Sequence, residues 1–102
     1  MAETSLDIKI RPGIPPEHRH QIEDAIGNRG LDIAGGGGFE DGSESDIMAY
    51  STNIRADLPI VIGILRQAKV GNDSCVIEAG SHEHPVYGDI VVPPAKPWWK
   101  FW

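Results

Sequence analysis

The four histidines of the chain form two His-x-His pairs, and the second pair is the better candidate for binding a metal. His82 and His84 lie in a Gly- and Pro-bounded segment, 80–85, which we expect to be a loop. If this loop is locally extended, both imidazoles point the same way and offer nitrogen ligands to a transition metal. His18 or Cys75 would then be the third ligand. The alternative is a pair of solvated loop histidines.

Nucleophilic chemistry has few candidates. The alternation in Ser74 to Ala79 predicts a strand that places Cys75 with Ile77 on the core face, where a thiol is usually inert. Ser43 is not in the Gly-x-Ser-x-Gly setting of a hydrolase nucleophile. Because the sequence shows no catalytic constellation, we expect that the protein is not an enzyme.

An acidic segment precedes the middle of the chain, with carboxylates at Glu40, Asp41, Glu44 and Asp46. A calcium loop starting at Asp41 would need Gly at its sixth position and Glu at its twelfth, but Asp46 and Thr52 stand there. The remaining interpretations are a solvated turn and an acidic projection that docks on the basic surface of another protein.

Four consecutive glycines, Gly35, Gly36, Gly37 and Gly38, form the second unusual segment and are a candidate ligand site through their backbone N–H groups. A phosphate loop would continue with Gly-Lys-Ser or Gly-Lys-Thr and a helix, whereas Phe39 and Glu40 follow here. A strand without side chains usually lets another group approach its backbone closely. We expect this group to be an aromatic ring.

The last five residues contain all three tryptophans of the chain, in the order Trp98, Trp99, Lys100, Phe101 and Trp102. Four exposed aromatic side chains would form an apolar patch that monomers seldom tolerate. The tail therefore folds back on its own sheet, crosses to a second subunit, or docks on another protein or a membrane interface.

The length and the composition of the chain are those of one globular domain. The chain has 102 residues, 40% of them hydrophobic and 24% charged, with one cysteine and a net charge of -6. Nucleic acids and anionic membranes need a basic face, so the charge argues against both as partners. No cofactor is indicated. The acidic start lacks a signal-peptide pattern, and we expect a cytoplasmic protein.

Periodicity predicts an α+β fold of element order β-α-β-β-α-β. The predicted strands are 6–10, 31–39, 46–52 and 74–79, with a fifth at 86–92, and the helices are Pro16 to Gly27 or Arg29 and a second one capped by Asp57 and ending near Gly71. This order is that of the ferredoxin-like split arrangement, an antiparallel sheet of four or five strands with two helices on one face. We expect residues 1–92 to be the domain. Residues 93–102 would form an aromatic C-terminal extension on the sheet or on a partner.

Small size, acidity and leftover apolar surface favour a protein-binding module that acts by stoichiometric association. Its most concrete form is an immunity-type or inhibitor protein that neutralises a partner protein. The acidic segment would steer a basic partner, and Trp98, Trp99, Phe101 and Trp102 would be its anchors. The alternative is a small-molecule or metal-binding regulatory domain that forms a homodimer through its sheet.

Overall fold

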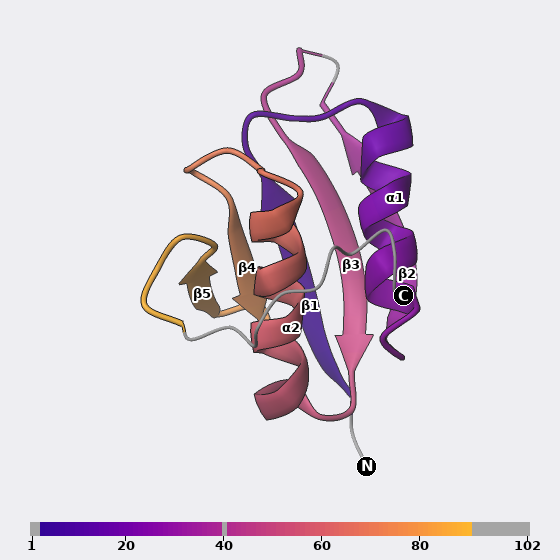
Figure 1. Ribbon diagram of the computed structural model, residues 1–102, viewed down its shortest axis with the longest axis vertical. Coiled ribbons are helices and arrows are strands. Elements are labelled where there is room, and N and C mark those ends of the chain that lie inside the picture. Colours follow the sequence, from indigo (N-terminus) through magenta and orange to yellow (C-terminus); the bar gives the residue numbers. More distant parts are fainter. Residues whose placement is uncertain (1–2, 40, 91–102) are drawn as a thin grey trace.

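The computed structural model describes residues 3–39 and 41–90, and these residues form an α+β fold (Figure 1). The elements follow in the order β1 (Thr4–Ile10), α1 (Pro16–Gly27), β2 (Asp32–Gly38), β3 (Ser45–Ser51), α2 (Ile54–Gln67), β4 (Cys75–Glu78) and β5 (His82–Pro85). The predicted α+β class is confirmed. The predicted extension at 93–102 lies outside the described residues.

The five strands form one antiparallel sheet in the order β2-β3-β1-β4-β5. This order differs from a four-stranded ferredoxin-like sheet, since β5 adds a strand beyond β4. Strand β1 lies at the centre, where Ile8 pairs with Ile47 of β3 on one side and with Val76 of β4 on the other. The two edges of the sheet are therefore β2 and β5.

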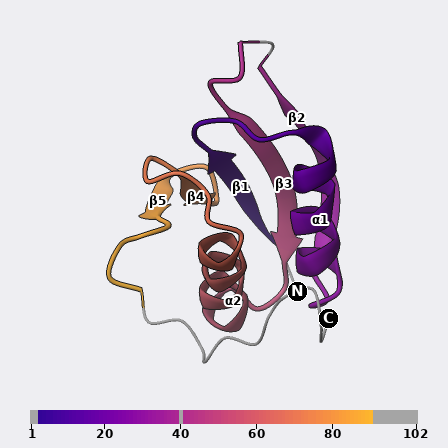
Figure 2. The ribbon, with the colours of Figure 1, turned by 45° about the horizontal axis from the view of Figure 1, so that its top comes forward.

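Both helices lie on the same side of the sheet (Figures 1 and 2). Alternate residues of β1 point toward them, because Leu6, Ile8 and Ile10 are fully buried while Asp7 and Lys9 are not. The helices contribute the other half of the core, and its fully buried members include Ile22, Ile26, Val61, Ile62 and Leu65. The sheet thus has a core face under the helices and an opposite face that carries charged side chains.

Helix α2 begins three residues earlier than its predicted cap. Asn53 is the N-cap residue, and Asp57 lies inside the first turn, where it accepts a hydrogen bond from the Ser51 hydroxyl at 2.6 Å. The prediction failed because Asp57 followed by Pro59 resembles a helix start, whereas Pro59 is accommodated within the helix. A carboxylate in this position still favours the helix, since it lies near the positive end of the helix dipole.

The predicted strand at 86–92 was wrong over its described residues, 86–90, which form no strand, and the predicted loop at 80–85 was wrong as well. Residues His82–Pro85 form β5, which pairs with β4 in the register His82 to Glu78 and His84 to Val76. The described part of the following segment packs against α2. There the Arg66 guanidinium donates to the carbonyls of Val86 at 2.7 Å and Gly88 at 3.0 Å. This segment covers part of the wide apolar surface of α2.

Among the described residues, no helix is both long and apolar enough to cross a lipid bilayer.

Candidate functional site

The strand with the four glycines is an edge of the sheet. Strand β2 pairs with β3 alone, and within residues 3–39 and 41–90 no strand lies beyond it. The register is regular from Gly36 to Gly38, opposite Ile47 to Ser45, and it shifts between Ile33 and Gly35. Gly35 has a φ of +149°, which a side chain would oppose. The regular, side-chain-free part of the edge is therefore Gly36–Gly38.

Gly36 is required because two neighbours approach its backbone closely. On the core face, the Arg19–Glu23 ion pair of α1 lies over this residue, with 3.3 Å between Arg19 Nε and Glu23 Oε2. A methyl group on Gly36 would contact the Glu23 carboxylate and would stand 2.8 Å from the Asp46 carbonyl oxygen. Close approach to the glycine strand was predicted, but on this face the approaching groups are charged side chains of α1. An aromatic ring from the tail is not tested, because the tail lies outside the described residues.

The backbone N–H and C=O groups of Gly36 and Gly38 point away from β3, toward the free edge of the sheet. Phe39 N–H donates to the Glu44 carbonyl at 3.0 Å, so these two residues, just after β2 and just before β3, take the position of a hydrogen-bonded pair in the register. Such pairs alternate with pairs whose N–H and C=O groups face outward. By this alternation Gly37 bonds to β3, whereas Gly36 and Gly38 each direct one donor and one acceptor toward the free edge. No side chain on these residues hinders access to them.

Phe39 continues the edge into the β2–β3 turn and is 62% exposed, the highest value among the large hydrophobic side chains described. The turn itself is fixed by hydrogen bonds, because Gly42 N–H donates to the Phe39 carbonyl at 3.0 Å and Gly13 N–H to the Gly42 carbonyl at 2.8 Å. Beside it lies an open pocket of about 520 Å³. Its lining includes Ile14, Pro16, Arg19, Gly38 and Phe39. A recess lined by both apolar and polar groups therefore lies next to the unpaired backbone.

The opposite edge is less accessible to a new strand. Strand β5 has four residues, His-Glu-His-Pro, and Pro85 has no N–H to offer. His82 and His84 are on one face, as predicted for an extended segment, and His84 Nε2 lies 3.0 Å from Glu78 Oε1. Cys75 is on the other face and cannot join them. Within the described residues, no group of three or more His, Cys, Asp or Glu side chains is arranged to hold a metal ion.

The acidic segment is partly neutralised by the chain itself. Glu44 accepts a hydrogen bond from Arg11 Nε at 2.8 Å and lies 3.6 Å from Lys9 Nζ. Asp46 lies 3.7 Å from the same ammonium group, and Asp7 is 3.4 Å from it. Asp41 is exposed in the turn, where it accepts from Ser43 N–H at 2.9 Å. Glu40 lies outside the described residues. The turn thus presents Asp41, while Glu44 and Asp46 belong to a charge cluster on the open face.

The hydrogen bond from Arg11 lowers the pKa of Glu44 against the opposing effect of burial, and the charges of Lys9 and Arg11 add to it. Burial by itself would lower the pKa of Lys9, but the carboxylates of Asp7, Glu44 and Asp46 outweigh it and raise that pKa. Both shifts favour the charged forms. The cluster is therefore a set of ion pairs that stabilises the fold at neutral pH.

The predicted orientation of Cys75 was wrong. Cys75 pairs with Lys9 across β1 and β4, so it lies on the open face, and it is Val76 that faces the helices. The thiol is nevertheless buried, at 2% exposure, beside a hollow of about 410 Å³ lined by Arg11 and Glu83 among others. Burial raises the pKa of the Cys75 thiol and the Glu83 charge adds to this, which opposes thiolate chemistry.

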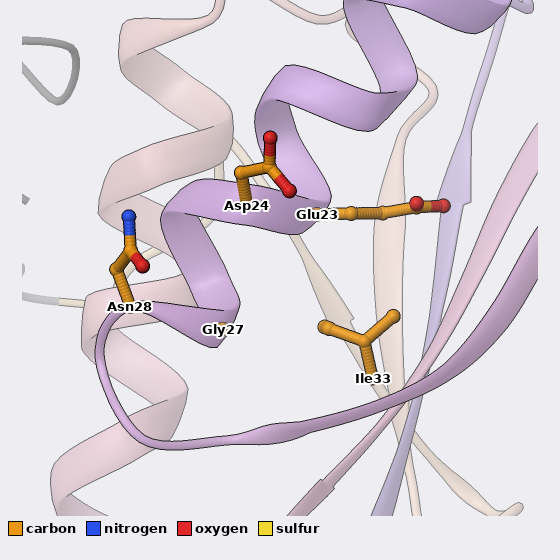
Figure 3. Close-up of a pocket in the computed structure, with 5 residues that line it drawn as sticks. All are labelled: Glu23, Asp24, Gly27, Asn28 and Ile33. Atoms are coloured by element: carbon orange, nitrogen blue, oxygen red, sulfur yellow. The ribbon is translucent and has the colours of Figure 1, made fainter.

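A third hollow, of about 440 Å³, lies between the C-terminal half of α1 and β2. Figure 3 shows Ile33 rising from β2 toward α1, with Glu23 and Asp24 on the helix and Asn28 where the chain leaves it. Two carboxylates and an amide at the mouth of an open hollow do not form a defined ligand set. Of the surfaces described, the β2 edge with Phe39 is the one whose geometry fits a specific type of partner.

Comparison of the chain with protein-family models, with curated proteins and with solved structures finds no match.

Alanine substitutions at two adjacent glycines should have opposite effects. Gly36→Ala should lower the free energy of unfolding by about 1–3 kcal/mol, because the Asp46 carbonyl is backbone and cannot yield easily. Gly37→Ala should be neutral or stabilising by about 0.5 kcal/mol, since its nearest neighbour, Asp46 Oδ1, is at an ordinary 3.6 Å. Chemical denaturation of both variants measures the difference. Equal destabilisation by the two substitutions would contradict the described contact.

Removing the Glu44 charge should reduce stability in a pH-dependent way. The folded-state pKa of Glu44 is lowered, so its stabilisation is complete above the ordinary value of 4.5 and is lost as pH falls through the lowered pKa. Glu44→Gln should therefore cost about 1 kcal/mol at pH 7 and little in strong acid. Glu3→Gln removes a carboxylate from an exposed residue ahead of β1 and is the matched control. A cost for Glu44→Gln that does not change with pH would refute the role of the ion pairs.

Proposed function

We propose that this chain is a small protein-binding module that accepts an extended strand of a partner protein along β2. The observation that carries the proposal is the edge at Gly36–Gly38, where two N–H and two C=O groups point outward and, within residues 3–39 and 41–90, no further strand pairs with them. Strand addition to a sheet edge uses main-chain hydrogen bonds for affinity and neighbouring pockets for specificity. The recess beside Phe39 supplies such a pocket.

The contrast between the two edges supports this use of β2. Exposed edge strands are aggregation hazards, and proteins commonly shorten them or place proline and charge on them. Strand β5 has these protections, with four residues that include Glu83 and Pro85. On β2 the register shift between Ile33 and Gly35 protects only the first half of the strand against unwanted pairing. The second half, Gly36–Gly38, has no such protection. An unprotected edge in a small domain is explained by a partner that covers it.

The most concrete form of the module is an immunity-type or inhibitor protein that neutralises another protein by stoichiometric binding. In this proposal the exposed Asp41 and the neighbouring Glu40 steer a basic partner toward the edge. Trp98, Trp99, Phe101 and Trp102 are further anchors. We also propose that the fold is a ferredoxin-like split arrangement extended by β5, on the basis of its element order.

The test uses a lysine on the edge strand. The side chain of Gly37→Lys has room, with Asp46 Oδ1 at 3.6 Å from the new Cβ, and it places a charge where an incoming strand must pair. Ser81→Lys adds the same charge in the exposed turn between β4 and β5 and is the control. Each tagged variant is incubated with lysate of the native host, and retained proteins are identified and then purified.

We expect a protein that the wild type and Ser81→Lys retain and that Gly37→Lys loses by about tenfold or more, a loss of about 1.4 kcal/mol. The purified protein should re-form a complex of fixed stoichiometry with the wild type. A partner that is retained equally by all three chains would place the binding surface elsewhere. If no chain retains a specific protein, the proposed function is wrong.

A further inference from the structure

The outward donors and acceptors of β2 can pair with those of an identical strand. The strand that this edge accepts can therefore be β2 of a second copy. A two-fold axis at Gly37 would place β2 antiparallel to β2 of a second copy. Gly36 would then lie opposite Gly38 of that copy, and Gly38 opposite its Gly36. Gly36 and Gly38 are the residues whose N–H and C=O groups point outward. Each of these pairings therefore joins two residues with outward donors and acceptors, and four main-chain hydrogen bonds form.

The side chains fit the same register. Phe39 would stand opposite Gly35 of the second copy, and the alternation of the strand puts both residues on the open face of their sheets. An exposed aromatic ring thereby gains a strand position without a side chain, where it can lie flat on the backbone. Cross-strand aromatic packing over glycine is a known way to stabilise such positions. The 62% exposure of Phe39 thus has an explanation, and Gly35, which its positive φ already favours as glycine, leaves room for the ring.

The strand itself offers no side chain that would hinder a second copy between Gly35 and Gly38. The residues nearest to the axis are all glycines, so the two backbones meet without side-chain conflict. On the core face, Arg19 and Glu23 form an ion pair over Gly36. Contacts of this kind are isologous, since each copy contributes the same surface, and they close after two subunits.

We propose that β2 pairs with β2 of a second copy in this register, joining two five-stranded sheets into one. The inference rests on the proposed function in one respect, since it assigns a partner to the same edge. Each copy carries a net charge of -6, which opposes association. The measurements therefore belong at an ionic strength of about 0.15 M, where screening acts beyond about 8 Å.

The first test is a cysteine at the axis. Gly37 would face Gly37 of the second copy in a non-hydrogen-bonded pair, with Cα atoms about 4.5 Å apart, within the range that a disulfide spans. Gly37→Cys should therefore form a covalent dimer under mild oxidation. Ser81→Cys, on the exposed turn at the other edge, controls for random collision. The native Cys75 is buried and should not cross-link.

The second test measures association without a covalent link. Sedimentation velocity of the wild-type chain, at concentrations up to about 1 mM, should show a monomer–dimer equilibrium. Gly37→Lys should raise the dimer dissociation constant roughly tenfold or more, because the two introduced ammonium groups would lie directly opposite each other. Ser81→Lys should leave the constant unchanged. Circular dichroism checks that the variants are folded.

Preferential cross-linking of Gly37→Cys together with a dimer that Gly37→Lys weakens would support the proposal. A wild-type chain that stays monomeric throughout, with cross-linking of Gly37→Cys no faster than that of Ser81→Cys, would overturn it. This outcome is separable from failure of the proposed function. If the chain is monomeric but a different protein is lost from Gly37→Lys, the edge binds that protein instead. If the dimer forms and no other protein depends on Gly37, strand addition by a different protein is contradicted.

Discussion

The close contact between α1 and the backbone of β2 constrains most of what is unusual in this domain. Glu23 and Arg19 lie on Gly36 so closely that no side chain fits there, while the Asp46 carbonyl limits the same position from the neighbouring strand. The helix can pack this near to the sheet because the strand beneath it is bare. The consequence is an edge whose main chain is accessible, since the residues that would normally cover it have no side chains.

A bare edge strand is costly for an isolated domain. Glycine loses more conformational entropy on folding than other residues do, by roughly 0.5–1 kcal/mol per position relative to alanine. Gly36 and Gly35 have local reasons, a close contact and a positive φ. Gly37 has neither, because a Cβ there would make an ordinary contact with Asp46. Nothing in the described residues explains its glycine.

The elements that could be predicted from the sequence are those that bury one face, because the burial of one face gives a regular pattern of apolar residues. The alternation of Leu6, Ile8 and Ile10 identified β1, and the proline-led helix predicted to end at Gly27 or Arg29 runs from Pro16 to Gly27. Strand β5 was missed, because His-Glu-His-Pro has no apolar alternation and is extended through backbone pairing to β4. The orientation of Cys75 was missed because Cys75, Ile77 and Ala79 look as apolar as Val76, and only the pairing with β1 decides between the two faces.

Within the site, the glycine run suggested close approach, but its approaching side chains come from α1 through tertiary packing. Periodicity within one strand does not reveal such a contact.

The central claim is that Gly36 and Gly38 direct their N–H groups to a free edge, while the N–H of Gly37 bonds to β3 and that of Phe39 to Glu44 just before β3. Residue-resolved amide hydrogen exchange by NMR, on a dilute sample, tests it most directly, because unpaired amides exchange fastest. The account predicts fast exchange at Gly36 and Gly38, slower exchange at Gly37 and Phe39, and added protection at the first two when the concentration rises or a partner is added. Protection of all four amides in dilute solution, or of none at any concentration, would contradict it.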